Sequence, residues 1–162
     1  MKIGIILGSI REERSGQTVA EWVAQESQAR QDATYELVDL KSFDVPLLTS
    51  ATVPGAANKQ YSDERVQRWS STIDSLGSEW ANKPVAFVSY GAEGGVRAVE
   101  HWRQIVANFH MYGVRQQISL SLFTEFGPEG VQPAERRSEE LATLFDQLEQ
   151  ATRRFSLVDA SA

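Results

Sequence analysis

Short apolar runs alternate along the chain with segments whose apolar positions repeat at helical spacing. The apolar runs predict strands, and the amphipathic segments predict helices. Strands are expected at residues 3–7, 35–40, 85–88 and within 114–123, and helices at 18–30, from 62 onward, at 96–109 and at 133–155. Strands that alternate with helices are typical of a parallel sheet covered by helices on both faces. The pattern predicts a single α/β domain over residues 1–162.

Turn-forming residues divide these elements. Residues 43–57 contain Pro46 and Pro54 among small residues, which predicts a long irregular connection of the kind that is more often functional than idle. Gly113 is expected to end the helix at 96–109. The run Gly127-Pro128-Glu129-Gly130 predicts a turn before the last helix.

Composition narrows the classes of function. The net charge of −6 disfavours nucleic-acid binding, and the absence of cysteine excludes disulfides and thiolate chemistry. His101 and His110 lie nine positions apart, so no histidine metal site is expected. The chain shows no leader-like segment or membrane-spanning run, which predicts a cytoplasmic protein without a membrane partner. The Glu12-Glu13 pair and the acidic and basic run from Glu135 to Glu140 are expected at the solvated surface.

The first predicted strand runs directly into a polar turn, residues 8–16, and then into a helix. A parallel strand carries the chain to the carboxyl edge of the sheet, where the N–H groups of the next helix favour a phosphate. The turn and helix start offer further donors: the hydroxyls of Ser9, Ser15 and Thr18, and the guanidinium groups of Arg11 and Arg14. Neither the nucleoside triphosphatase nor the dinucleotide glycine motif is present, which favours a mononucleotide. The alternative is a solvated turn whose arginines face water.

A second loop, residues 89–98, also connects a strand to a helix and is expected at the same edge. The pair Gly94-Gly95 removes side chains, so that a flat ligand can contact the backbone and accept its N–H groups. One loop for a phosphate and another for a planar ring describe flavin mononucleotide (FMN). Alternatively, the glycines serve flexibility at the helix entry, and the Tyr90 ring caps the core.

Three stretches carry a resemblance to a known family: residues 7–16, 44–48 and 80–98. In these stretches, and in the order of its strands and helices, the chain resembles the NADPH-dependent FMN reductase family of flavodoxin-like proteins. This family includes quinone, chromate and azo-compound reductases. The resemblance implies a flavodoxin-like three-layer sandwich. It also implies hydride transfer from NADPH or NADH through FMN to a quinone-like or other small acceptor, and a homodimer or homotetramer.

The resemblance also assigns site residues. It implies that the FMN phosphate is bound by Ser9, Arg11, Ser15, Gln17 and Thr18, and that the ring is lined by Ser89, Tyr90, Gly91, Gly94 and Gly95. Arg97 is expected either near the pyrimidine edge of the flavin or paired with a neighbouring acid. No catalytic acid or base and no metal ligand is assigned, because the cofactor performs the difficult chemistry.

The chain departs from the family between residues 73 and 80. There the family has a further strand, a Thr-Pro-Glu-Tyr-Asn loop against the flavin, and the start of a helix. This chain has no room for them, and Ser75-Leu76 is the apparent junction. Either the strands flanking the gap pair directly, giving four strands in the order 2-1-4-5 in family terms, or the sequence omits residues of the physical protein. In the first case flavin affinity falls, which leaves a flavodoxin-like binding or scaffold protein as the alternative function.

Overall fold

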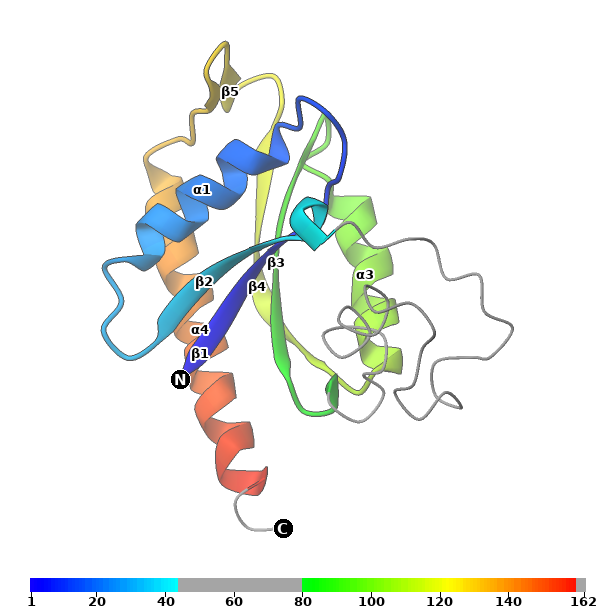
Figure 1. Cartoon of the computed structure of the whole chain (residues 1–162), viewed down its shortest axis with the longest axis vertical. Coiled ribbons are helices and arrows are strands. Elements are labelled where there is room, and N and C mark those ends of the chain that lie inside the picture. The colour runs from blue at the N-terminus through cyan, green and yellow to red at the C-terminus, as the bar shows by residue number, and fades with distance from the viewer. Residues whose placement is uncertain (44–79, 160–162) are drawn as a thin grey trace.

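The computed structural model describes residues 1–43 and 80–159 (Figure 1). In chain order they form β1 (Lys2–Leu7), α1 (Gly16–Ser27), β2 (Thr34–Asp39), the 3-10 helix η1 (Leu40–Phe43), β3 (Pro84–Gly91), α3 (Val96–Asn108), β4 (Tyr112–Ser121), β5 (Phe126–Gly127), β6 (Gly130–Val131) and α4 (Arg136–Asp159). The predicted elements in these ranges are present within a few residues. The predicted connection after residue 43, the helix from residue 62, the family-like stretch 44–48 and the junction Ser75-Leu76 lie outside the described residues.

The long strands form two parallel pairs. β1 pairs with β2 in a register that runs from Lys2 opposite Thr34 to Leu7 opposite Asp39. β3 pairs with β4 and ends with Gly91 opposite Ser121. Within the described ranges β1 and β3 share no hydrogen-bonded ladder, so the expected single sheet of order 2-1-4-5 is replaced by two separate pairs. Direct pairing of the strands that flank the gap was the wrong alternative for the described structure.

Helices lie on both faces of the strands, which confirms the α/β, flavodoxin-like arrangement of layers (Figure 1). On one face α1 and α4 bury a core against β4; its fully buried members are Val19, Val23, Ile118, Leu120, Leu141, Leu144 and Phe145. Ile5 of β1 and Val88 of β3 pack against this same cluster. One apolar core therefore joins the two strand pairs, although no strand ladder does so. On the other face α3 lies against β3 and β4.

The end of α3 differs from the expectation. His110, with φ of 55°, takes the left-handed conformation that glycine usually supplies after a helix. The N–H groups of His110 and Met111 donate to the carbonyls of Ala107 and Val106, at 3.0 Å each. These bonds satisfy the last helical carbonyls in a Schellman motif. Gly113 therefore does not end the helix, because the chain has already turned and entered β4 at Tyr112.

A buried ion pair fixes the short hairpin that β5 and β6 form around the predicted turn at 127–130. Glu125 is 4% exposed and accepts bonds from Arg137 at the start of α4, at 2.7 and 3.0 Å. Its carboxylate also accepts the backbone N–H of Ser121, at 2.9 Å. The hydrogen bond from Arg137 holds the pKa of Glu125 at about 2. The sequence pattern did not predict this buried carboxylate.

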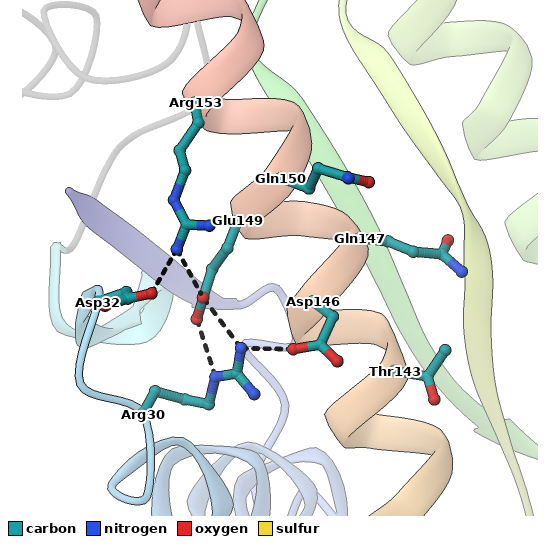
Figure 2. Close-up of a pocket in the computed structure, with 8 residues that line it drawn as sticks. All are labelled: Arg30, Asp32, Thr143, Asp146, Gln147, Glu149, Gln150 and Arg153. Atoms are coloured by element: carbon teal, nitrogen blue, oxygen red, sulfur yellow. Dashed lines mark hydrogen bonds and ion pairs between the residues drawn. The ribbon is translucent and has the colours of Figure 1, made fainter.

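A second buried carboxylate ties α4 to β2 and to the end of α1 (Figure 2). Glu149 is 2% exposed and accepts bonds from Arg30, at 2.9 and 3.0 Å, and from the Tyr35 hydroxyl, at 2.8 Å. Arg30 also donates to Asp146, and Arg153 pairs with Asp32. The charged residues of this cluster, but not Tyr35, line a cavity of about 370 Å³. The cluster lies at the amino end of β2, away from the carboxyl ends of the strands.

Candidate functional site

The two predicted loops meet at one rim of the strands (Figure 1). The Tyr90 hydroxyl, at the end of β3, lies 3.1 Å from the position that a Cβ atom would occupy on Gly16, the first residue of α1. The Tyr90 ring also packs against Phe126 of β5, with centroids 5.6 Å apart. The end of β3, the start of α1 and the β5–β6 hairpin therefore surround one area at the carboxyl ends of the strands.

The start of α1 presents donors that the protein itself does not use. Ser15 occupies the N-cap position, yet its side chain makes no capping hydrogen bond. Within the described residues, no hydrogen bond is found for the hydroxyl of Ser9 or for the backbone N–H groups of Gly16 and Thr18. Unpaired N–H groups at a helix start attract anions, because they carry the positive end of the helix dipole. This end of the site is suited to a phosphate.

Gly8 leaves open space beside these donors. A Cβ atom built on Gly8 meets no other heavy atom of residues 1–43 and 80–159 within 4 Å, and Gly8 is not among the residues with positive φ. Neither internal packing nor backbone conformation therefore requires glycine at this position. The bare backbone leaves room for a ligand to approach the loop.

The two arginines of the first loop have different surroundings. Arg11 is exposed and makes no hydrogen bond or ion pair with the described part of the chain. Arg14 is 7% exposed in its side chain and forms a two-pronged ion pair with Asp39 at the end of β2. The same guanidinium donates to the carbonyl oxygen of Ser9, at 2.5 Å. The expectation that both arginines offer their charge to a ligand was wrong for Arg14, because protein oxygens already occupy its terminal nitrogens.

The polar side chains on α1 are also engaged within the protein. Thr18 donates its hydroxyl hydrogen to the carbonyl of Ser15, at 3.1 Å, and its oxygen accepts the N–H of Val131, at 3.0 Å. Gln17 is exposed and donates to Glu21 one turn along the helix, at 3.0 Å. The Thr18 contacts attach the β5–β6 hairpin to α1, a role that the sequence pattern did not reveal.

The glycines of the second loop have a packing role. Gly94 and Gly95 both have positive φ, 65° and 73°. A Cβ atom on Gly94 would stand 2.9 Å from Cβ of Ser119, and one on Gly95 would stand 2.9 Å from Cβ of Ser89. Side chains are thus excluded by the turn itself and by its close approach to β3 and β4. The alternative of mere flexibility at the helix entry is not what the geometry shows.

Ser89 holds this turn in place. Its hydroxyl donates to the carbonyl of Gly94, at 2.7 Å, and lies 3.3 Å from the carbonyl of Ile118. Gly91 accepts the N–H of Gly94, at 3.1 Å, which closes the turn. Arg97, one turn further, is exposed and forms no ion pair within the described ranges, so pairing with a neighbouring acid is not observed. The backbone of residues 91–95 faces the rim on a rigid turn.

Other kinds of site find no support in the described ranges. No group of three or more histidine, cysteine, aspartate or glutamate side chains there is placed to hold a metal ion. Within the same residues, no helix is both long enough and apolar enough to cross a membrane. The Glu149 cluster is a network of mutually paired charges rather than a set of free donors.

The layers and the two loops at one rim define an α/β protein of the flavodoxin-like class. A sequence model of the family described as NADPH-dependent FMN reductase matches residues 1–76 and 69–125, so the chain belongs to that family. This confirms the resemblance drawn from the sequence. The two matched segments overlap at residues 69–76, which contain the Ser75-Leu76 junction, and this supports a discontinuity relative to the family at that point.

Three curated relatives are each described as an NAD(P)H-dependent FMN reductase. The chain is 32% identical over 126 residues to the Nectria sp protein ntnL, a match that covers 60% of this chain and 63% of the relative. It is 29% identical over 119 residues to a Schizosaccharomyces pombe protein, with 58% and 60% covered. For a Saccharomyces cerevisiae protein, 26% identity extends over 145 residues, with 68% and 76% covered. The chain thus spans less than two thirds of the length of the first two relatives.

Proposed function

We propose that this protein is an FMN-dependent NAD(P)H oxidoreductase that passes electrons to a quinone-like or other small acceptor. Membership of the NADPH-dependent FMN reductase family supports the proposal, as do the relatives described as NAD(P)H-dependent FMN reductases. The observation that carries it is the start of α1, where the N-cap side chain of Ser15 makes no capping hydrogen bond and the N–H groups of Gly16 and Thr18 have no partner within the described residues.

We assign the phosphate of FMN to this end of the site. Ser9 and Ser15 offer hydroxyl groups, the first turn of α1 offers N–H groups, and Arg11 supplies a positive charge that nothing in the described chain neutralises. Thr18 and Gln17 border the same turn and remain assigned to it. Thr18 retains acceptor capacity only, so its contribution is to hold the hairpin beside the phosphate.

We assign the flavin ring to the second loop. Tyr90 lies between the two loops, and the backbone of Gly91, Gly94 and Gly95 follows it on a fixed turn. Ser89 keeps that turn closed. Arg97 is exposed in the first turn of α3, where its charge is available to the electron-rich edge of a reduced flavin.

FMN, when bound, supplies the two-electron chemistry: it accepts a hydride from reduced nicotinamide and returns the electrons to an acceptor. The protein's own residues bind the phosphate, orient the ring and place positive charge near it. No side chain is assigned as an acid or base. The resemblance further supports a cytoplasmic homo-oligomer, for which the exposed Trp102 and Ile105 of α3 and Phe109 at its C-cap offer apolar side chains.

The test is reconstitution with FMN. The purified protein is incubated with FMN, freed of excess by gel filtration, and examined for flavin absorbance bands that are released on denaturation. NADPH or NADH oxidation is then followed with a small quinone as acceptor. Bound flavin with acceptor-dependent turnover is the expected result. A colourless protein that cannot be reconstituted contradicts the proposal and favours a flavodoxin-like binding or scaffold protein without flavin chemistry.

A further inference from the structure

We propose that Arg14 and Asp39 together form a positioning element for the phosphate loop, rather than a part of the phosphate site itself. The inference rests on the proposed function, and it concerns how this chain holds residues 8–15 in a shape that binds FMN. Throughout, Arg14 acts through the loop backbone and not by contact with the ligand.

Arg14 is bound on two sides by the protein. One terminal nitrogen, Nη1, donates both to Asp39 Oδ1, at 2.7 Å, and to the carbonyl of Ser9, at 2.5 Å. The other, Nη2, pairs with Asp39 Oδ2. With a side chain only 7% exposed, the guanidinium lies beneath the loop rather than in the solvent above it. It therefore ties the start of the loop, at Ser9, to the end of β2.

Asp39 is itself fixed. It is the last residue of β2 and lies in register with Leu7, the last residue of β1. Its Oδ1 also accepts the backbone N–H of Lys41, at 2.9 Å, and its carbonyl accepts the Ser42 hydroxyl, at 2.7 Å. Contacts within both β2 and η1 therefore hold Asp39 in place. Because Arg14 binds Asp39, the loop of residues 8–15 is held in a fixed position relative to these two elements.

The surface of the same loop carries a weaker link and a free charge. Glu12 pairs with Lys41, at 2.9 Å, but its side chain is 90% exposed, so this pair contributes little. Arg11 stands exposed without a partner in the described ranges. The two arginines of the loop therefore have different roles. Arg14 holds the shape of the loop through contacts within the protein, and Arg11 presents its charge to the ligand.

Two interpretations of Asp39, as a nearby charge or as a positioning residue, predict opposite changes in FMN affinity when its charge is removed. If only charge matters, a carboxylate near a bound phosphate repels it, and removing that charge strengthens FMN binding. If Asp39 positions the loop through Arg14, removing the charge breaks the two-pronged pair and weakens FMN binding. Riboflavin lacks the phosphate, so its affinity reports the ring end of the site alone.

The experiment compares Asp39→Asn with wild type by titrating FMN and riboflavin against the full chain at low and moderate salt. We expect FMN affinity to fall about tenfold, the scale of one lost charged hydrogen bond, with riboflavin affinity unchanged. Arg14→Lys keeps the charge but not the fork, and the same loss is expected. Glu12→Gln is the matched control: it removes an equal charge from the same loop without touching the pair, and FMN affinity should not fall.

Unchanged or tighter FMN binding by Asp39→Asn overturns the inference, while FMN binding by the wild type still supports the proposed function. A wild type that binds no FMN overturns both. If Asp39→Asn does not fold, Asp39→Glu keeps the charge and shifts the carboxylate by one methylene. A partial, phosphate-specific loss is then expected, and FMN and riboflavin affinities that fall equally contradict the inference.

Discussion

The hydroxyl of Tyr90 and the backbone of Gly16 approach so closely that a methyl group on Gly16 would stand 3.1 Å from the tyrosine oxygen. Tyr90 belongs to β3 and Gly16 to α1, so this contact connects the two halves of the candidate site. It couples the position of the second loop to that of the first. The coupling is open to a double-mutant cycle.

Gly16→Ala should destabilise the protein by about 1 kcal/mol, because the added methyl group crowds Tyr90 and Leu7. Tyr90→Phe removes the nearer of these contacts. Gly16→Ala should therefore cost less in the Tyr90→Phe protein than in the wild type, with a coupling free energy of at least about 0.5 kcal/mol. Chemical denaturation of the four proteins measures this. Tyr112→Phe, at an exposed tyrosine of β4, is the control background. Additive effects with Tyr90→Phe would show that the contact carries no energy.

Gly8→Leu should weaken FMN binding by at least about tenfold and leave the free energy of unfolding unchanged, because within the described residues no heavy atom lies within 4 Å of the Cβ position. Gly4→Ala, on the preceding strand and in ordinary contact distance of Val38, should alter neither quantity. The measurements are FMN titration and denaturation. Full FMN affinity in Gly8→Leu would show that the ligand does not approach the loop there.

Arg11→Ala should weaken FMN binding by about 1 to 3 kcal/mol, the usual scale for a lost charged hydrogen bond. Riboflavin binding should not change, since it has no phosphate. Arg154→Ala removes an equal charge from the exposed surface of α4 and serves as control. Identical FMN affinities for Arg11→Ala and wild type would remove the first loop from the phosphate site.

Glu125 should make stability depend on acid pH. Its pKa is about 2 in the folded protein against an ordinary value of 4.5, so its stabilisation is complete above pH 4.5 and is lost as the pH falls toward 2. Glu125→Gln should flatten this dependence and lower the free energy of unfolding at neutral pH by about 2 kcal/mol, because the buried Arg137 loses its charged hydrogen bonds to Glu125 and keeps only Glu140 as an ionic partner. Denaturation across pH 2 to 7 tests this. The exposed Glu129→Gln should behave as wild type, and a similar slope in both variants would count against the assignment.

Local patterns predicted the elements because their causes are local. The helical spacing of Leu141, Leu144 and Phe145 in α4 reflects burial, which the structure confirms, whereas in the apolar run of β1 only Leu7 is buried and Ile6 is exposed. The first-loop expectation also followed from chain order, since a strand that enters a helix delivers its turn to the sheet edge. The end of α3 could not be predicted in this way. His110 takes a conformation that Gly113, three residues later, seemed better suited to supply.

Contacts between residues far apart in the sequence explain the other differences between the predicted and the observed surroundings of side chains. Arg14 resembles Arg11 in sequence, yet Asp39, 25 residues away, engages only Arg14. Glu149 sits on a helix like the solvated carboxylates around it, but Tyr35 and Arg30 bury and bind it. In each case the deciding partner lies far along the chain.

Within the part of the chain that the structure describes, the two strand pairs share side-chain packing but no backbone ladder. The first loop extends from one pair and the second loop from the other. A nucleotide that contacted both loops would therefore link the β1–β2 pair to the β3–β4 pair, which the described backbone does not join by hydrogen bonds. Such a bridging molecule should raise thermal resistance more than its phosphate and ring fragments supplied together as separate compounds.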